Sequence, residues 1–308
     1  MAAQNEPIKL PSPGEAIDRQ PITLCPEIPL SKAIALMSQR GLGLEPALTT
    51  INHSYLIILE AERIVGIFTR RDAVRLTAAA ANLESVTVGE VLTSKVITLA
   101  ESEFKDIFAA LSLFRQHRIR HLPIVDEVGQ LVGVVTHDRI CQILDPSSWL
   151  KWRRVAEVMV EEVIIAPPTA SAIEVAQLMA THRVSSVVIC DTAHTGGRIP
   201  LGTITEADIL QMPLGVKDLG QIQAPTIMRQ LPFCLQPTDS LWTAQAQMQN
   251  HHVGRLVVCD AKGEMVGIVS QTSLLLSLES VEEIYRVVGN LQNQVALLER
   301  EKTELLEQ

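Results

Sequence analysis

Hydrophobic and polar positions follow a cycle that occurs four times along the chain. In the second cycle, an apolar run from Val96 to Leu99 precedes apolar residues at helical spacing (Phe104, Ile107, Phe108 and Leu111). Two further apolar runs, HLPIVD and QLVGVVT, then flank a polar turn. Short apolar runs predict strands and the three-to-four spacing predicts a helix. The predicted order is therefore strand, helix, strand, strand, helix.

The other three cycles have the same order. Their paired strand runs are YLIILE with RIVGIFT, SVVICD with IPLGTIT, and RLVVCD with EMVGIVS. Internal repetition of this kind defines the units of a fold. We divide the chain into an N-terminal tail (1–15), repeat 1 (16–81), repeat 2 (82–148), repeat 3 (149–215), repeat 4 (216–280) and a C-terminal segment (281–308).

Each repeat is too small to complete a core alone. A unit of about 60 residues with a three-stranded sheet leaves one sheet face uncovered. We therefore expect the repeats to pair, which gives two modules from four repeats.

A short motif follows the second hairpin strand of every repeat: GIFTRRD at Gly66, GVVTHDR at Gly133, GTITEAD at Gly202 and GIVSQTS at Gly267. Its Ser or Thr stands where a helix is predicted to begin. There the hydroxyl can cap the free backbone N–H groups or join them in holding a phosphate. Three residues later, a carboxylate occurs only as Asp72 and Asp208, whereas repeats 2 and 4 carry Arg139 and Ser273.

These motifs resemble those of the cystathionine β-synthase (CBS) domain family, whose tandem pairs form Bateman modules that bind adenine nucleotides. The resemblance covers roughly residues 16 to 280. It implies a mixed α/β (α+β) fold of four βαββα repeats paired into two Bateman modules. It also implies ATP, ADP or AMP as a regulatory ligand, with no required cofactor and no metal. With this resemblance and the basic residues near the motifs, the residues predicted at the ligand are Thr69, Asp72, Arg70, Arg120, His121, Thr23, Thr205 and Asp208.

Within that family the Asp of the motif contacts the ribose hydroxyls and the Ser or Thr contacts phosphate. A capping box is the alternative for Thr69 with Asp72 and for Thr205 with Asp208, because such a box satisfies helix ends without any ligand. Both readings remain open from the sequence.

Basic residues distinguish the two modules. In module 1 (repeats 1 and 2), Arg70, Arg71 and Arg75 can meet Arg118, Arg120 and His121, a cluster suited to a polyphosphate. The equivalent helix of module 2 (repeats 3 and 4) begins with Glu206, and its nearest bases are Arg183, His251, His252 and Arg255. A monophosphate, a nucleoside or no ligand is expected there.

Composition excludes several function classes. A net charge of −9 argues against a general nucleic-acid surface, which needs basic residues. No run is long and apolar enough for a membrane span, and the polar N-terminus is unlike a signal peptide, so we expect a cytoplasmic protein. Five cysteines without CxxC spacing predict neither a disulfide nor a zinc site. No catalytic motif is found, and we expect no enzyme activity.

The C-terminal segment carries heptads. Apolar residues recur at alternating spacings of three and four, with one lysine interrupting the series: Val281, Ile284, Val288, Leu291, Val295, Leu298, Lys302 and Leu305. Valine at a and Leu or Ile at d favour a parallel two-stranded coiled coil. The alternative is an amphipathic helix folded back on a module. The pattern continues to Gln308, and the arrangement resembles bacterial sensors in which CBS pairs lead into PAS, GAF, histidine kinase or diguanylate cyclase modules.

The sequence thus favours a non-catalytic homodimeric sensory module that passes a ligand-induced change through the coiled coil to an output domain. That output domain would lie in cis beyond residue 308 or in trans. The alternatives are a structural dimerisation unit with degenerate sites and a module for another adenosine ligand, such as S-adenosylmethionine or cyclic di-AMP.

Overall fold

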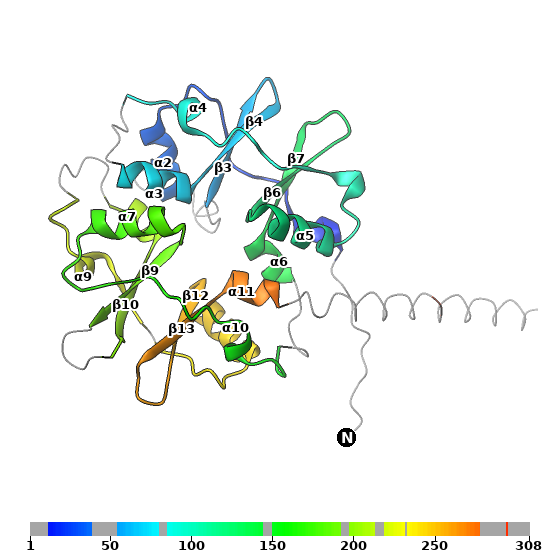
Figure 1. Cartoon of the computed structure of the whole chain (residues 1–308). Helices are drawn as coiled ribbons and strands as arrows, with labels where there is room; N and C mark the ends of the chain where they lie inside the picture. Colours follow the sequence, from blue (N-terminus) through cyan, green and yellow to red (C-terminus); the bar gives the residue numbers. More distant parts are fainter. Residues whose placement is uncertain are drawn as a thin grey trace, which may run out of the picture.

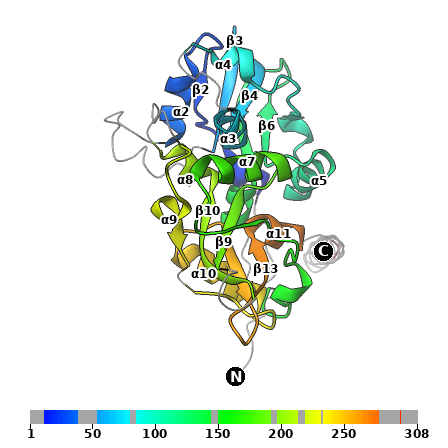
Figure 2. The same cartoon turned by 60° about the vertical axis from the view of Figure 1, so that its left-hand side comes forward.

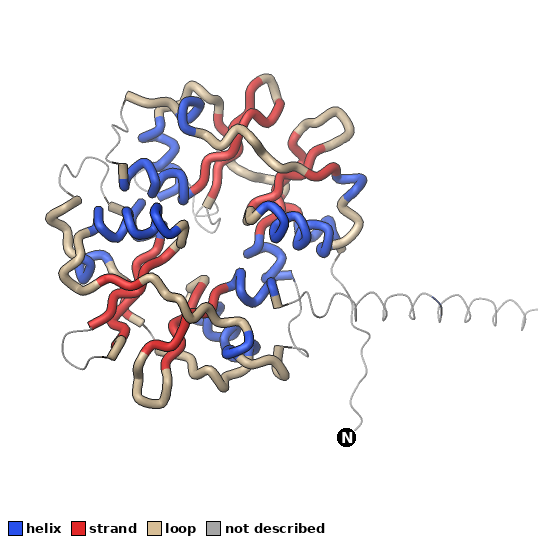
Figure 3. Tube along the Cα trace, viewed as in Figure 1, coloured by secondary structure: helices blue, strands red, loops and turns tan. Residues whose placement is uncertain are grey.

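Four similar α+β units lie around a common centre in the computed structural model of the chain (Figure 1). Going around the centre, their order is repeat 1, repeat 2, repeat 4 and repeat 3. The structure describes residues 12–38, 54–79, 85–143, 150–191, 197–212, 219–231, 233–277 and 294. Every unit combines a hairpin of two strands with helices, as Figure 3 shows by colour.

Module 1 contains the elements of repeats 1 and 2. Repeat 1 and the residues before it form α1 (Pro13–Ala16), β1 (Ile17–Asp18), β2 (Thr23–Leu24), α2 (Leu30–Ser38), β3 (Tyr55–Glu60), β4 (Arg63–Thr69) and α3 (Arg70–Ala78). Repeat 2 forms α4 (Val88–Val91), β5 (Leu99–Ala100), the 3-10 helix η2 (Glu101–Glu103), α5 (Ile107–His117), β6 (His121–Val125), β7 (Leu131–Thr136) and α6 (His137–Ile143).

Module 2 has the same plan. Repeat 3 forms the 3-10 helix η3 (Val155–Glu157), β8 (Ile165–Ala166), α7 (Ala172–His182), β9 (Ser186–Asp191), β10 (Ile199–Thr205) and α8 (Glu206–Leu210). Repeat 4 forms α9 (Ala224–Ile227), β11 (Arg229–Gln230), α10 (Leu241–Asn250), β12 (Arg255–Cys259), β13 (Met265–Ser270) and α11 (Gln271–Leu276). The strand and helix order predicted from the cycles is confirmed in repeats 1 to 3, and in repeat 4 the first predicted strand is reduced to a single bridge between Leu235 and Val258.

The hairpin register places equivalent residues side by side in every repeat. β3 pairs antiparallel with β4 so that Tyr55 lies opposite Thr69. In the same way His121 lies opposite Thr136, Ser186 opposite Thr205, and Arg255 opposite Ser270. The first residue of each first hairpin strand is therefore the cross-strand neighbour of the motif hydroxyl.

Each repeat gives its leading segment to its partner in the module. β1, at the start of repeat 1, pairs with β7 of repeat 2, and β11, at the start of repeat 4, pairs with β10 of repeat 3. Backbone bridges place Thr93 against Ile67 and Val160 against Ile268, which makes the exchange reciprocal. The motif glycines lie under these crossing segments. A Cβ on Gly133 would overlap the carbonyl oxygen of Asp18, so the close approach requires glycine.

Within each module the two sheets face one another. In module 1 the contact is a buried cluster that includes Tyr55, Ile57 and Ile67 of repeat 1 and Val134 of repeat 2. In module 2 it includes Val188 and Cys190 of repeat 3 with Val257, Cys259 and Met265 of repeat 4. The predicted pairing of repeats through their sheet faces is confirmed.

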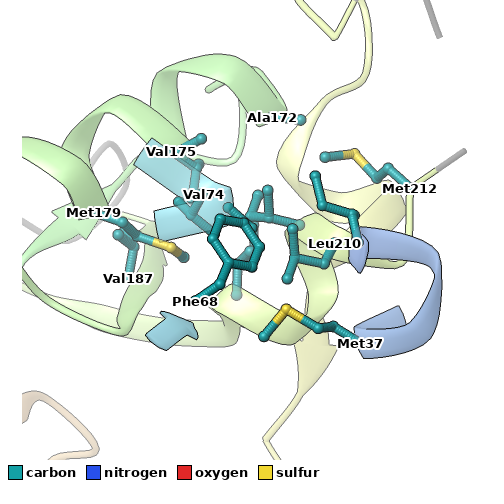
Figure 4. Packing of buried hydrophobic residues seen from close by; sticks show 14 of the residues in the cluster. Met37, Phe68, Val74, Ala172, Val175, Met179, Val187, Leu210 and Met212 are labelled. Atoms are coloured by element: carbon teal, nitrogen blue, oxygen red, sulfur yellow. The ribbon is translucent and has the colours of Figure 1, made fainter. Parts of the chain in front are cut away.

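The two modules meet through helices. Repeats 1 and 3 share one buried cluster in which α3 packs against α7 and α8. Figure 2 shows α3 and α7 from the side, and Figure 4 shows Phe68, Val74, Val175 and Leu210 within the cluster. Repeats 2 and 4 meet through α6 and α11, where Leu275 enters the core of repeat 2. Helix-to-helix contact at both sides leaves the motif helices around the centre of the molecule.

The coiled coil predicted over residues 281–308 lies outside the described residues, apart from Gln294 in a helix. Among the residues that the structure does describe, no helix combines the length and apolarity that crossing a membrane would require.

Candidate functional site

The motif hydroxyls and carboxylates of repeats 1 and 3 form capping boxes. Thr69 donates from its backbone N–H and from Oγ1 to Oδ2 of Asp72, at 2.9 and 2.7 Å. The backbone N–H of Asp72 returns a bond to Thr69 Oγ1 at 3.4 Å, which completes the box. Thr205 and Asp208 repeat this geometry at 2.9, 2.6 and 3.4 Å. In both boxes the second carboxylate oxygen, Oδ1, takes no part.

The two Oδ1 atoms have different neighbours. Asp208 Oδ1 accepts a hydrogen bond from Arg229 Nε at 2.7 Å, and the Asp208 side chain is 5% exposed. Asp72 Oδ1 has Arg75 Nη2 at 3.8 Å, beyond hydrogen-bond length. The Oδ1 atom of Asp72 can therefore still accept a hydrogen bond, whereas Oδ1 of Asp208 already accepts one from Arg229.

In repeats 2 and 4, the residue three positions after the motif hydroxyl makes a structural hydrogen bond. Arg139 donates from Nε to the carbonyl oxygen of Glu15 at 3.0 Å and so fixes the N-terminal helix α1 to repeat 2. Ser273 caps α11 together with Ser270. Neither residue supplies a carboxylate for a ribose, as expected from the motif.

A cavity of about 990 Å³ occupies the centre, lined by all four repeats. The first residue of each motif helix lines it: Arg70, His137, Glu206 and Gln271. Further charged lining residues are Arg71, Asp72, Arg118, Arg120, Asp138, Arg229 and Arg255. The volume suits a small-molecule ligand.

Two partly buried guanidinium groups in this cavity, those of Arg70 and Arg255, have no ion pair within the described part of the chain. Arg255, at the start of β12, is partly buried, and burial lowers its pKa to about 10 although Glu206 and Asp208 oppose the shift. Burial likewise lowers the pKa of Arg70, against the attraction of Glu206 and Asp138, and Arg70 Nε is buried without a hydrogen-bond partner. A buried, unpaired cation is costly, so this cavity is favourable for an anion.

Glu206 lies between two arginines of the other module. Its carboxylate oxygens are 3.8 Å from Arg71 Nε and 3.7 Å from Arg120 Nη2. Burial lowers the pKa of Arg71, with further lowering from the charge of Arg120. Repeats 1, 2 and 3 therefore meet in one charge cluster, which the sequence had divided between separate modules.

Two histidines that line the cavity, His121 and His137, have lowered pKa values. His121 accepts or donates a hydrogen bond at Nε2 with Ser54 Oγ at 3.0 Å and packs on Tyr55. Burial and the charge of Arg120 hold its pKa well below the ordinary value. Burial also lowers the pKa of His137 to about 3. His121 lines the cavity, but its ring faces arginines that disfavour a positive charge on it, so the arginines supply the positive charge of the cluster.

Six of the eight predicted ligand residues line the cavity: Thr69, Arg70, Asp72, Arg120, His121 and Thr205. Asp208 is not in the lining and is held by Arg229. Thr23 is exposed on β2, outside the lining. Sequence reasoning missed Arg229, which lies in a crossing segment that has no motif of its own.

Described His, Cys, Asp and Glu side chains do not assemble into any group of three or more that could hold a metal ion. The five cysteines are free thiols.

Four segments of the chain match the CBS domain family model: residues 14–79, 88–145, 155–215 and 219–280. The chain belongs to the CBS domain family. The predicted number of CBS repeats and their fold are confirmed.

The chain is similar to several known proteins, of which three are described by identity and coverage. The crystal structure of MJ1225 from Methanocaldococcus jannaschii, proposed as an archaeal homologue of γ-AMPK, has a TM-score of 0.70, 20% identity, and coverage of 87% of this chain and 99% of that chain. MK0525 from Methanopyrus kandleri is 31% identical over 133 residues, which cover 43% of this chain and 62% of that protein. PAE2072 from Pyrobaculum aerophilum, solved with AMP, is 27% identical over 42% of this chain and 99% of its own, with a TM-score of 0.37.

Proposed function

We propose that this protein is a regulatory module that binds an adenine nucleotide with its phosphates in the central cavity. The observation that carries the proposal is the pair of partly buried guanidinium groups of Arg70 and Arg255, which line the cavity, come from different modules and make no ion pair with a described residue. Arginine suits planar two-point contact with phosphate oxygens. A bound polyanion would offset the cost of burying both cations.

Asp72 is the proposed ribose contact. It lines the cavity, and no described residue donates a hydrogen bond to its Oδ1, so Oδ1 can accept from a ribose hydroxyl while Oδ2 continues to cap α3. Thr69 adds its hydroxyl at the N-terminus of the same helix, next to Arg70. Capping and ligand binding are therefore compatible at this site. At Asp208 the same contact would first require the loss of the Arg229 bond.

The output of the module is proposed to pass through the C-terminal segment. Ligand binding between paired repeats would change their relative angle, and a parallel coiled coil over residues 281–308 would carry this change to an output domain in cis or in trans. Two chains would form the coiled coil, so the unit is a homodimer. Cytoplasmic location and the absence of catalysis belong to this proposal.

A structural dimerisation unit is the second candidate. The capping boxes favour it, because the motif hydroxyls of Thr69 and Thr205 are satisfied without a ligand. Another adenosine ligand, S-adenosylmethionine or cyclic di-AMP, is a variant of the first candidate. The phosphate requirement separates these ligands.

A ligand panel tests the proposal. ATP, ADP, AMP, adenosine, S-adenosylmethionine and cyclic di-AMP are screened by thermal shift on the full chain, and the hits are measured by calorimetry. We expect binding of at least one adenine nucleotide, which weakens in Arg255→Gln. If no member of the panel raises the melting temperature or releases heat, the structural unit is the better description.

A further inference from the structure

Glu206 differs in charge from its three counterparts at the cavity. The first position of the motif helix is Arg70 in repeat 1, His137 in repeat 2 and Gln271 in repeat 4, and all of them line the same cavity. Repeat 3 alone places a carboxylate there. Glu206 is only 7% exposed, so its charge acts on the cavity with little screening by solvent.

The carboxylate of Glu206 is held by charge without hydrogen bonds. Its distances to Arg71 Nε and Arg120 Nη2, 3.8 and 3.7 Å, exceed hydrogen-bond length. In the described part of the chain its carboxylate accepts no hydrogen bond. A carboxylate held in this way is easier to displace than one in a bidentate pair with arginine.

Arg71 and Arg120 are two further groups of module 1 that can receive phosphate, beside Arg70. They come from different repeats, α3 of repeat 1 and the residue before β6 of repeat 2, and their side chains are 46% and 31% exposed. Each can therefore be reached from the cavity. While Glu206 lies between them, part of their positive potential is already neutralised.

We propose that Glu206 competes with ligand phosphates for Arg71 and Arg120, and so lowers the affinity of the site for anionic ligands in proportion to their charge. This inference rests on the proposed function. A triphosphate meets more repulsion from Glu206 than a monophosphate does, and a neutral nucleoside meets none. Glu206 thereby narrows the preference for ATP over AMP that the surrounding arginines would otherwise impose. Because Glu206 belongs to module 2, its displacement also links ligand binding in module 1 to the contact between the modules.

The test compares Glu206→Gln with the unmodified chain by calorimetry against ATP, AMP, adenosine and inorganic tripolyphosphate. Glu206→Gln is nearly isosteric and removes only the charge. We expect it to bind ATP and tripolyphosphate about 5- to 10-fold more tightly, with a smaller gain for AMP and less than about a twofold change for adenosine. Glu101→Gln is the matched control, because it removes the same charge from an exposed ion pair with Arg19 outside the cavity. We expect no change in its affinities.

A second variant keeps the test decisive if Glu206→Gln does not fold. Glu206→Asp keeps the charge but withdraws it from both arginines, and we expect an intermediate gain for ATP. ATP that binds the unmodified chain and Glu206→Gln equally, or binds Glu206→Gln more weakly, would overturn the inference and leave the proposed function standing. No binding of any of the four probes to either protein would overturn both.

Discussion

Arg229 donates a hydrogen bond from Nε to Oδ1 of Asp208 at 2.7 Å. This contact gives the two motif carboxylates different hydrogen-bond partners, although the hydrogen-bond distances in their capping boxes are nearly the same. Asp208 has both oxygens committed, one to Thr205 and one to Arg229. Asp72 has one oxygen committed to Thr69 and faces the cavity. We therefore expect one strong ribose site, in module 1.

Replacing Asp72 with Asn tests this expectation. Asn keeps an acceptor for the backbone N–H of Thr69 but loses the second carboxylate oxygen and the charge. Nucleotide binding should weaken by about 1.5 to 3 kcal/mol, the range for a hydrogen bond to a charged group. Calorimetry with AMP measures the change.

Asp208→Asn is the matched control for Asp72→Asn. It alters an identical capping box, and we expect AMP affinity to change by less than about twofold, which is under 0.5 kcal/mol. Equal losses in both variants would show that the effect arises from the caps. An unchanged affinity in Asp72→Asn would remove Asp72 from the ribose contact.

The motif hydroxyls, the Asp72 carboxylate and the arginines of module 1 could be found from the sequence, because they lie within repeating strings of known order. Arg255 was also named among the bases near the module 2 site, and it begins β12 just as His121 begins β6, so that both lie opposite a motif hydroxyl. The contact of Glu206 with Arg71 and Arg120 could not be found from the sequence. It depends on how the modules pack, and side-chain volumes at the α3–α7 contact decide that packing, whereas periodicity does not.

The exchange of leading segments was also hidden in the sequence. The hydrophobic pattern of a repeat is the same whether its first segment pairs with its own sheet or with the sheet of the partner repeat. The physical signal was the glycine of each motif. Gly133 and Gly202 lie beneath the backbone of β1 and β11, and a Cβ on Gly202 would come within 2.7 Å of the Arg229 carbonyl oxygen.

Replacing Gly133 with Ala should therefore destabilise module 1. The new methyl group meets a backbone oxygen of Asp18, which cannot move unless β1 leaves β7. Overpacking of this kind costs about 1 to 3 kcal/mol. Urea unfolding followed by circular dichroism measures the loss as a lower midpoint.

Gly14→Ala provides the comparison for Gly133→Ala. Apart from its own helix backbone and chain neighbours, no atom of a described residue lies within 4 Å of a Cβ at Gly14, and alanine favours the helix in which it stands. We expect no loss of stability from Gly14→Ala. An equal stability of Gly133→Ala and the unmodified chain would mean that β1 is not held against β7 in solution.

Stability should fall between pH 7.5 and pH 5.5. His137 has a pKa of about 3 in the folded chain, because it is buried beside Arg120, and about 6.5 when unfolded. The unfolded state therefore takes up a proton first as the pH falls below 6.5, and stability is lost progressively down toward pH 3. Between pH 7.5 and pH 5.5, one such histidine lowers the free energy of unfolding by about 1.4 kcal/mol. His121, whose pKa is also lowered, adds a second contribution.

Urea unfolding at the two pH values measures this dependence. His137→Gln keeps a partner for Thr272 and removes the titration, so we expect about half of the pH dependence to disappear. The exposed His182→Gln should leave it unchanged. A pH dependence that is the same in His137→Gln as in the unmodified chain would exclude His137 as its source.

The C-terminal heptads predict a parallel coiled coil over residues 281–308, which lie outside the described part of the chain apart from Gln294. In a parallel two-stranded coiled coil, the two copies of each d residue face one another. Leu298 stands at a d position and Glu301 on the outward face. Under mild oxidation, Leu298→Cys should crosslink two chains readily, whereas Glu301→Cys should crosslink less.

Both variants are made in a Cys25→Ser background, because Cys25 is exposed and could crosslink by itself. Removal of residues 285–308 should weaken dimerisation in analytical ultracentrifugation but leave nucleotide affinity largely intact, since the cavity is lined by repeats 1 to 4. A chain that remains monomeric at micromolar concentration with its C-terminal segment intact would mean that the heptads pack on a module. The coiled coil would then be unavailable as the link between the cavity and an output domain.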